Sequence, residues 1–397
     1  MTADGVFVTG ATGFIGRHLV LGLLERGFRV FALTRAANGR QAGDRLTHAL
    51  QSAHGRPLPE QMLARLQPVD GDLVKPDLGL QENVQKGLAA KVGQIFHCGG
   101  DTRFFPKDRA AYRAVHLDGP LHILRTIDRG QGVRFHHVST AYVAGRRNGT
   151  AFEDELAVGQ SFRNPYERIK LEAEQAIRSA CESRGIGLTI FRPSIVIADP
   201  RVPSANWSDP ISTRFAGFAR LCGFYRHTLG RIRALRPSLR VRGSGKSALN
   251  VVPITFVVEA MLAIAGNGRT SPGTFHLVDP APPRNQELLD RISELLGLRG
   301  LEPFEHRTLP IEGASLLERV VENLLRPYQD YFFESPTFDD RHARRLLNGV
   351  VEPRSATALE FLASAARTSL PAGFIPSDAP VPEKGDRALE GAGDLFP

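Results

Sequence analysis

The chain has 397 residues and a formal net charge of +8, with 42% hydrophobic and 23% charged residues, so a globular protein with two lobes, or one large domain with an insertion, is expected. Its three cysteines stand far apart, which argues against a disulfide framework or a zinc site, so we expect no bound metal. With no apolar run of about 18 residues and no signal-peptide pattern at the N-terminus, we expect a cytoplasmic protein.

Short apolar runs alternate with helical stretches through the first half of the chain. Strands are predicted at 5–10, 29–35, 68–73, 92–100, 133–145 and 187–198, and helices at 14–27, 107–129 and 165–184. Strands alternating with helices of ten or more residues are typical of a parallel, doubly wound sheet. The predicted fold class is therefore α/β.

Three glycines, Gly10, Gly13 and Gly16, lie between the first predicted strand and the first predicted helix, in the run VTGATGFIG. Glycine is required where a backbone turns tightly, approaches a phosphate or packs a helix against a strand. The first N–H groups of the helix, with its dipole, can then hold an anion. The spacing predicts a dinucleotide site of the Rossmann type.

The alternation weakens after residue 200. A basic stretch follows, with nine Lys and Arg residues and no acidic residue between Asp209 and Glu259, and it suggests a local anionic partner rather than nucleic acid. An apolar segment covers 247–266, a strand is predicted at 273–279, and residues 315–318 form a capping box. We predict a nucleotide-binding domain at 1–200, rejoined by 247–280, a smaller, mainly helical substrate lobe at 201–246 and 281–375, and a disordered tail at 376–397.

Tyr166 and Lys170 lie four residues apart in the predicted helix 165–184, so both are on one helical face. A phenol has an unperturbed pKa near 10 and is a poor acid at neutral pH, whereas a neighbouring ammonium favours its ionised form. The pair alone is weak evidence for an acid–base site, but together with the glycine turn far upstream it becomes strong evidence.

These motifs resemble the extended short-chain dehydrogenase/reductases. The resemblance rests on TGATGFIG, DGDL, FHCGG, HHVSTAYVAG, Tyr166-x-x-x-Lys170 and FRPSIV, which follow in that family's order over about residues 5–280. It implies that Thr140, or its neighbour Ser139, hydrogen-bonds the reacting carbonyl and that Tyr166 donates the proton. Lys170 would bind the nicotinamide ribose and lower the tyrosine pKa. The cofactor-binding set it implies is Gly10, Thr12, Gly13, Phe14, Ile15, Gly16, Arg35, Arg45, Asp72, Leu73, Cys98, Gly99, Tyr166, Lys170, Pro193 and Ile195.

Two positions depart from the family pattern. His116 stands where these enzymes usually carry Asn, and Ile169 replaces the small residue usually found before the catalytic lysine. We expect His116 to be structural rather than catalytic.

The residues after the second predicted strand indicate which cofactor is used. NAD-specific sites usually place an acidic residue there, to accept a hydrogen bond from the ribose 2′-hydroxyl. This chain has Arg35 instead, with Arg45 ten residues further on, and a guanidinium suits a 2′-phosphate. NADPH is therefore the predicted cofactor.

Further motifs reduce the number of substrate classes to be considered. VFALTRA, residues 71–80, SALNVVPITFVVEAM and GTFHLVDPAPP resemble the fatty acyl-CoA reductase and thioester reductase branch. That branch implies reduction of an acyl thioester, on coenzyme A or an acidic carrier protein, to an aldehyde and sometimes to an alcohol. The alternatives are reduction or oxidation at a ketone or hydroxyl of a sterol-like, β-keto or nucleotide-sugar substrate, and a non-catalytic dinucleotide sensor.

Apolar residues recur at helical spacing within 212–235, with arginines on the other faces. Three interpretations stay open: a lid over an acyl tunnel, a helix lying on a membrane surface, and a helix packed on the substrate lobe. The sequence does not predict the oligomeric state.

Overall fold

The computed structural model describes residues 4–37, 39–127, 132–199, 238–266, 273–296, 298–334, 336–349 and 351. The stretch 212–235 and the tail 376–397, on which two of the predictions fall, lie outside the described residues.

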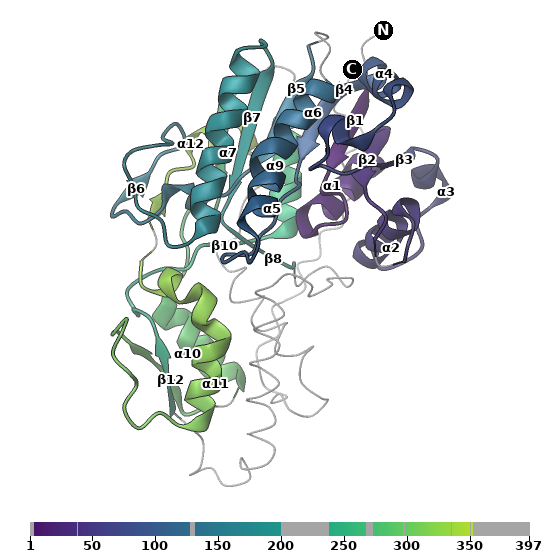
Figure 1. Ribbon diagram of the computed structural model, residues 1–397. Coiled ribbons are helices and arrows are strands. Elements are labelled where there is room, and N and C mark those ends of the chain that lie inside the picture. Colours follow the sequence, from purple (N-terminus) through teal and green to yellow (C-terminus); the bar gives the residue numbers. More distant parts are fainter. Residues whose placement is uncertain are drawn as a thin grey trace.

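Seven parallel strands form the central sheet, in the order β11-β7-β5-β4-β1-β2-β3 (Figure 1). The order reverses between β1 and β4, and in open parallel sheets ligands bind at such a switch point, beyond the carboxyl ends of the strands. The predicted doubly wound α/β fold is confirmed. The strands are β1 (Gly5–Thr9), β2 (Val30–Thr34), β3 (Leu66–Asp70), β4 (Val92–His97), β5 (Arg134–Val138), β7 (Gly187–Pro193) and β11 (Gly273–Leu277).

Helices cover both faces of the sheet, and each face has its own apolar core. One core joins the sheet to α1 (Phe14–Glu25), α2 (Ala42–His54) and α9 (Ile254–Gly266). The other joins it to α4 (Glu82–Lys91), α6 (Gly119–Ile127) and α7 (Pro165–Glu182). The short helix α3 (Glu60–Leu63) precedes β3.

The segment 107–129, predicted as one helix, is divided into three pieces. Helix α5 (Arg109–Arg113) runs into a π-helical turn, η2 (Ala114–Asp118), which continues as α6. The turn is centred on His116, whose side chain is buried. A π-helical turn of this kind often marks a functional position.

The chain leaves the sheet and returns to it. Strand β8 (Ile195–Ile197) pairs with β10 (Val251–Pro253), and α9 packs on α1. Strand β13 (Thr337–Phe338) pairs with β6 (Thr150–Ala151), and α12 (Arg341–Leu347) contacts α9 and β11. Residues 337–347 thus pack on the sheet domain, although they fall within the range predicted for the substrate lobe. Three short turns of helix connect these elements: η1 (Pro76–Gly79), η3 (Ala141–Ala144) and η5 (Arg326–Phe332).

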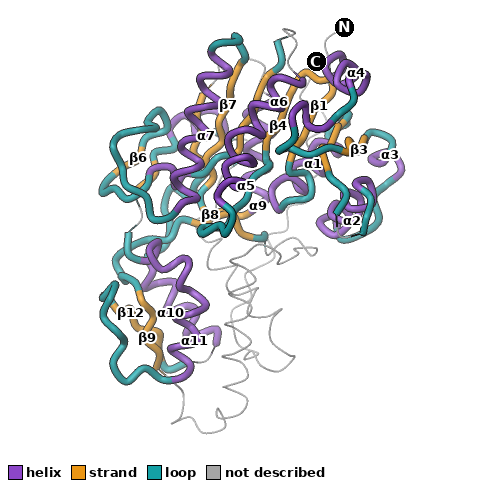
Figure 2. The backbone as a smooth tube through the Cα atoms, viewed as in Figure 1, coloured by secondary structure: helices purple, strands orange, loops and turns teal. Residues whose placement is uncertain are grey.

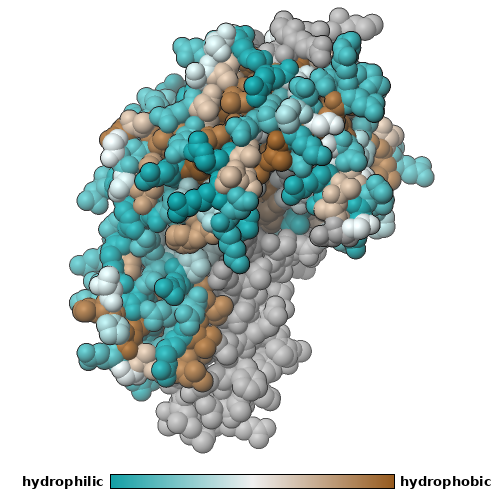
Figure 3. All heavy atoms as spheres, in the orientation of Figure 1, coloured by the Kyte–Doolittle hydropathy of each residue, from teal (hydrophilic) through white to brown (hydrophobic). Residues whose placement is uncertain are grey.

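A small lobe lies below the sheet domain in the view of Figures 1 and 2. It contains α10 (Asn285–Leu296), α11 (Leu316–Leu325) and a parallel pair of strands, β9 (Ser238–Arg242) and β12 (Gly300–Phe304). The strand pair was not predicted. Figure 3 shows apolar residues on the surface of this lobe. Leu316, the first residue of α11, is 75% exposed.

No helix in the described part of the chain is both long and apolar enough to cross a bilayer.

Candidate active site

The glycine turn lies between β1 and α1. Gly10 has a φ of +70°, and a Cβ placed on it would lie 2.6 Å from the carbonyl carbon of Cys98. A Cβ on Gly16 would lie 2.2 Å from the carbonyl oxygen of Gly10. These two positions therefore require glycine, because the turn touches β4 on one side and the helix on the other.

Gly13 has a different surrounding. A Cβ there would meet one atom within 4 Å, the carbonyl oxygen of Gly10 at 3.1 Å, and the residue is exposed. It caps α1 without a side-chain hydrogen bond, so the first N–H groups of the helix, from Phe14 onward, have no side-chain partner at the cap. Open space over an uncapped helix start fits the pyrophosphate of a dinucleotide.

Two arginines and a carboxylate meet beyond β2. The guanidinium of Arg35 lies 3.6 Å from the carboxylate of Asp72, and Arg45 donates a hydrogen bond to the backbone carbonyl of Arg35. The Arg35 side chain is 65% exposed. The structure thus brings together three residues of the predicted cofactor-binding set.

The other predicted cofactor residues follow the carboxyl ends of neighbouring strands. Gly99, after β4, donates its N–H to the hydroxyl of Thr9, and a Cβ on it would lie 3.1 Å from the Leu73 side chain. Cys98 is partly exposed, and burial raises the pKa of its thiol to about 12, so it is no nucleophile at neutral pH. Thr12 and Ile15 belong to the glycine turn and α1, and Pro193 and Ile195 to the ends of β7 and β8.

Two hydroxyls follow β5. Thr140 Oγ1 accepts a hydrogen bond from the N–H of Tyr142 at 3.3 Å and donates to the carbonyl of Pro193 at 3.4 Å. Ser139 is buried, and its Oγ has no partner among the residues that the structure describes. Both hydroxyls lie at the switch-point edge of the sheet, and Thr140 remains the predicted one.

Tyr166 lies in the first turn of α7, which Asn164 caps by accepting the N–H of Glu167 at 3.0 Å. Its ring is 5.8 Å from that of Phe104 and 6.4 Å from that of His116. Burial, and to a lesser degree the Glu167 carboxylate, raise the pKa of the Tyr166 phenol above its usual value. This direction differs from the lowering that the resemblance implied, because desolvation disfavours the phenolate in the absence of a cofactor.

Lys170, one turn further along α7, is 4% exposed and donates to the carbonyl of Val138 at 2.7 Å. Burial lowers the pKa of its ammonium to about 8. The rings of His97 and His137, side by side on β4 and β5, are stacked 5.3 Å apart, and the Lys170 charge helps to lower the pKa of both. Sequence reasoning missed this neutral histidine pair, because only the register of the sheet brings the two residues together.

His116 is held by the backbone. Its Nε2 lies 3.0 Å from the carbonyl oxygen and 3.2 Å from the amide nitrogen of Asp101. Burial lowers its pKa to about 4, so the ring is neutral near pH 7. The contact ties the π-helical turn to the loop that carries Phe104, which is consistent with a structural role.

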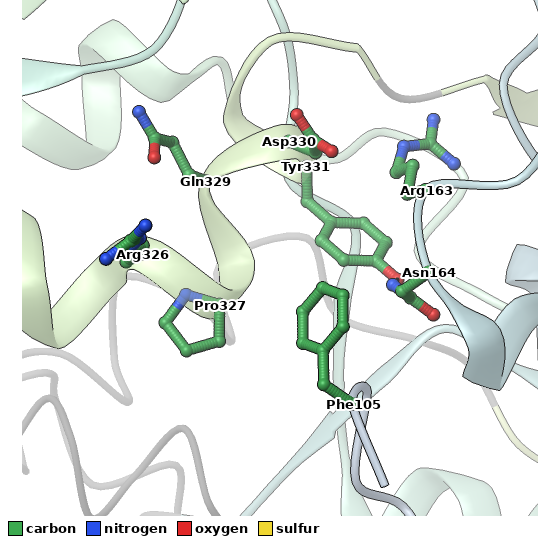
Figure 4. Close-up of a pocket in the computed structure, with 8 residues that line it drawn as sticks. All are labelled: Phe105, Arg163, Asn164, Arg326, Pro327, Gln329, Asp330 and Tyr331. Atoms are coloured by element: carbon green, nitrogen blue, oxygen red, sulfur yellow. The ribbon is translucent and has the colours of Figure 1, made fainter. Parts of the chain in front are cut away.

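A pocket of about 440 Å³ lies between the sheet domain and η5 (Figure 4). The sequence did not indicate it, because its two walls come from segments about 160 residues apart. It is lined by Phe105, Arg163, Asn164, Arg326, Pro327, Gln329, Asp330 and Tyr331.

Within the described ranges, no three His, Cys, Asp or Glu side chains come close enough together to hold a metal ion.

Comparison with known proteins agrees with this geometry. The male sterility protein family matches residues 8–261. The chain is 25% identical to a nonribosomal peptide synthetase, asaC, of Aspergillus flavus, covering 94% of this chain and 37% of that protein. It is 24% identical to a putative fatty acyl-CoA reductase, CG8303, of Drosophila melanogaster, covering 65% of this chain and 51% of that protein. The chain thus spans about a third to a half of these relatives.

Among solved structures, the chain superimposes on the terminal R domain from the myxalamid PKS-NRPS biosynthetic pathway. The TM-score is 0.75 at 24% identity, over 95% of this chain and 92% of that one. This likeness shows a shared fold, including the small lobe. With the family match over more than half of its length, the chain belongs to the male sterility protein family, a group of oxidoreductases of the extended short-chain dehydrogenase/reductase type that bind a nicotinamide dinucleotide.

Proposed function

We propose that the chain reduces acyl thioesters with NADPH, releasing an aldehyde and a free thiol. The observation that carries the proposal is the common edge on which the glycine turn, Tyr166 and Lys170 lie, next to the pocket between the sheet domain and η5. The names of the relatives, a peptide synthetase and a putative fatty acyl-CoA reductase, support a thioester as the substrate.

NADPH, when bound, supplies the hydride that adds to the thioester carbonyl carbon. As the carbonyl electrons move to oxygen, the Thr140 hydroxyl hydrogen-bonds that oxygen and Tyr166 gives it a proton. The resulting hydroxyl then loses its proton to the sulfur as the carbon–sulfur bond breaks. A protonated Tyr166, which its raised pKa ensures, is the form that this direction of reaction needs.

Lys170 acts next to Tyr166. Its ammonium stabilises the phenolate that remains after proton transfer, and its N–H groups can bind the nicotinamide ribose. The surrounding histidines are neutral near pH 7, so they add no competing positive charge.

The choice of NADPH rests on Arg35 and Arg45. Arg45 is bonded to the Arg35 backbone and Asp72 faces the Arg35 guanidinium, so the guanidinium is held at the end of β2 without being buried. A 2′-phosphate arriving there would meet two cations.

The substrate would arrive on coenzyme A or on a carrier protein. The relatedness to a peptide synthetase favours the carrier protein, since such enzymes hold their intermediates as thioesters on one.

A thiol-release screen tests the proposal. Wild-type protein is mixed with NADPH and a series of acyl-CoA and carrier-bound acyl thioesters, and free thiol and NADPH oxidation are followed together. For each aldehyde formed, we expect equal amounts of free thiol and of oxidised NADPH. The rate of the reaction should fall about 10²–10⁴-fold in Tyr166→Phe. NADPH oxidation with a β-keto or sterol substrate and no thiol release would contradict the proposal. Tight NADPH binding by both proteins with no turnover of any substrate would favour a sensor.

A further inference from the structure

We infer that Tyr331, on η5, is a positioning residue for Tyr166: its hydroxyl holds the first turn of α7, and with it the proton donor, in the orientation that turnover requires. The inference rests on the proposed function only in taking Tyr166 as the proton donor. It gives the segment after α11 a part in the chemistry of the sheet domain, although 167 positions separate Tyr331 from its partner Asn164.

The Tyr331 hydroxyl makes two hydrogen bonds to the start of α7. It accepts one from the Asn164 side-chain amide at 2.9 Å and donates one to the Glu167 carboxylate. Figure 4 shows the hydroxyl pointing at Asn164. Asn164 is the N-cap and Glu167 belongs to the first turn, with Tyr166 between them. The two bonds thus hold the helix on either side of the proton donor.

The first turn of a helix is the part that needs such support. Its N–H groups have no backbone partners within the helix, so it frays unless side chains hold it. Here Asn164 Oδ1 accepts the N–H of Glu167 at 3.0 Å, and the Glu167 carboxylate accepts the N–H of Arg163 at 2.9 Å. Both side chains are also the partners of the Tyr331 hydroxyl. Loss of that hydroxyl would therefore loosen the two groups that keep Tyr166 in place.

Tyr331 is itself held firmly. It is 2% exposed, the Arg163 guanidinium lies 5.2 Å from its ring centroid, and the Tyr142 ring meets it edge-on at 4.8 Å. Arg163 in turn donates to the carbonyls of Gly145 and Glu334, each at 2.9 Å. Burial raises the pKa of the Tyr331 phenol above its usual value, so the hydroxyl stays protonated and able to donate.

A ring contact also joins Tyr331 to Tyr166. The Phe104 ring lies 5.6 Å from the ring of Tyr331 and 5.8 Å from that of Tyr166. This contact depends on the ring of Tyr331 and not on its hydroxyl. Tyr331→Phe would therefore keep the packing and remove only the two hydrogen bonds.

Steady-state kinetics of Tyr331→Phe with NADPH and an acyl-CoA thioester test the inference. We expect kcat to fall about tenfold, while the KM of the thioester and the Kd of NADPH stay within about twofold, because a misplaced proton donor slows the chemical step and leaves binding intact. A merely structural role would lower stability without this split. Tyr112→Phe is the matched control: its buried hydroxyl donates to the Arg103 carbonyl at 3.0 Å instead of to α7, so kcat should be kept.

Asn164→Ser tests whether Tyr331 acts through the helix cap. Serine can cap a helix but has no side-chain amide to donate to the Tyr331 hydroxyl. We expect kcat to fall in this variant too, and the double variant to be about as slow as Tyr331→Phe alone, since both changes break the same link. Losses that multiply in the double variant would overturn the inference.

Three further kinetic results would overturn it as well: an unchanged kcat in Tyr331→Phe, a raised KM with kcat unchanged, or an equal loss of kcat in Tyr112→Phe. Amide hydrogen exchange gives a readout without turnover, and the first turn of α7 should exchange faster in Tyr331→Phe than in the wild type or Tyr112→Phe. If the thiol-release screen finds a ketone substrate instead, the kinetic comparison uses that ketone. If nothing is turned over, unchanged exchange alone overturns the inference, so the two proposals fail separately.

Discussion

The sheet domain and the small lobe are stabilised in different ways. Aromatic residues on the sheet strands, such as Phe7, Phe96 and Phe135, are almost fully buried in two extensive apolar cores. In the lobe, ion pairs join β9 to α11: Arg240 to Glu318 at 2.8 Å, and Arg242 to Glu322 at 2.6 Å. The sheet domain thus relies on buried apolar side chains, whereas the lobe adds these ion pairs to a smaller set of buried apolar residues, among them Leu239, Leu301 and Val321.

Lys170 gives the largest expected effect, because it is a charged group buried in the sheet domain. Lys170→Met should lower thioester reduction about 100-fold or more. It should also raise the free energy of unfolding at pH 7, by up to roughly 3 kcal/mol, because burial lowers the pKa of the native ammonium from 10.5 to about 8. An activity assay measures the loss of thioester reduction, and urea unfolding measures the change in unfolding free energy. A variant that is inactive and less stable would contradict the buried-charge argument.

The same pKa predicts a pH limit for the wild type. Reduction should fall as the pH rises above about 8, where Lys170 loses its charge. The stability cost of Lys170 is fully present below pH 8 and disappears as the pH rises toward 10.5, so wild-type stability relative to Lys170→Met should rise over that range. A pH–rate profile and unfolding at pH 7 and pH 10 measure the two trends. A flat profile between pH 7 and 9 would argue against a role for the ammonium.

Gly10→Ala tests the packing of the glycine turn against β4. The new Cβ would lie 2.6 Å from the Cys98 backbone in a residue with a φ of +70°, so we expect a loss of roughly 3 kcal/mol or more in unfolding free energy, together with weaker NADPH binding. Gly185→Ala is the control, since its φ is +66° and no atom lies within 4 Å of the added Cβ. It should cost about 1 kcal/mol. Equal losses would mean that the close approach of β1 and β4 is unimportant.

Arg35 tests the choice of cofactor on the same edge. Arg35→Ser should weaken NADPH binding about tenfold and leave NADH binding unchanged, because a charge-assisted bond to the 2′-phosphate is lost. Arg29→Ser, at the opposite end of β2, controls for the loss of one exposed positive charge. The Kd values of both variants for NADPH and NADH test this prediction. If Arg35→Ser weakens NADH binding as much as NADPH binding, Arg35 does not contact the 2′-phosphate.

The smallest effect is expected in the lobe. Arg242 is 7% exposed, and Arg242→Gln removes its pair with Glu322 and its bond to the Leu309 carbonyl, at a cost of about 1–2 kcal/mol. Amide hydrogen exchange in β9 and β12 should quicken, while the sheet strands stay protected. Arg26→Gln, which breaks an exposed pair with Glu259 on the sheet domain, should change little. Faster exchange across the whole sheet would show that the two regions unfold together.

The sequence predicted the sheet domain better than the lobe. The motifs of the sheet domain consist of residues that lie close together in the chain. Gly10, Gly16, Tyr166 and Lys170 are marked by spacings within a few residues, and the structure places them on one edge. Helix α4 went unpredicted, since it buries only Leu88 and Ala89 and so has little apolar period. Strand β9, SLRVR, went unpredicted because two of its five residues are arginines of the basic stretch, so it carries no continuous apolar run.

The sequence by itself determined the α/β sheet, the nucleotide turn and the helical face shared by Tyr166 and Lys170, because periodicity and helix spacing are local properties of the chain. Only the tertiary structure decided which charges of the molecule are free. Arg240 and Arg242, counted in the basic stretch that suggested an anionic partner, are neutralised by α11, whereas Arg326 stands unpaired at the pocket within the described ranges. Pairing depends on side chains that folding brings together from distant positions, and no local pattern records it.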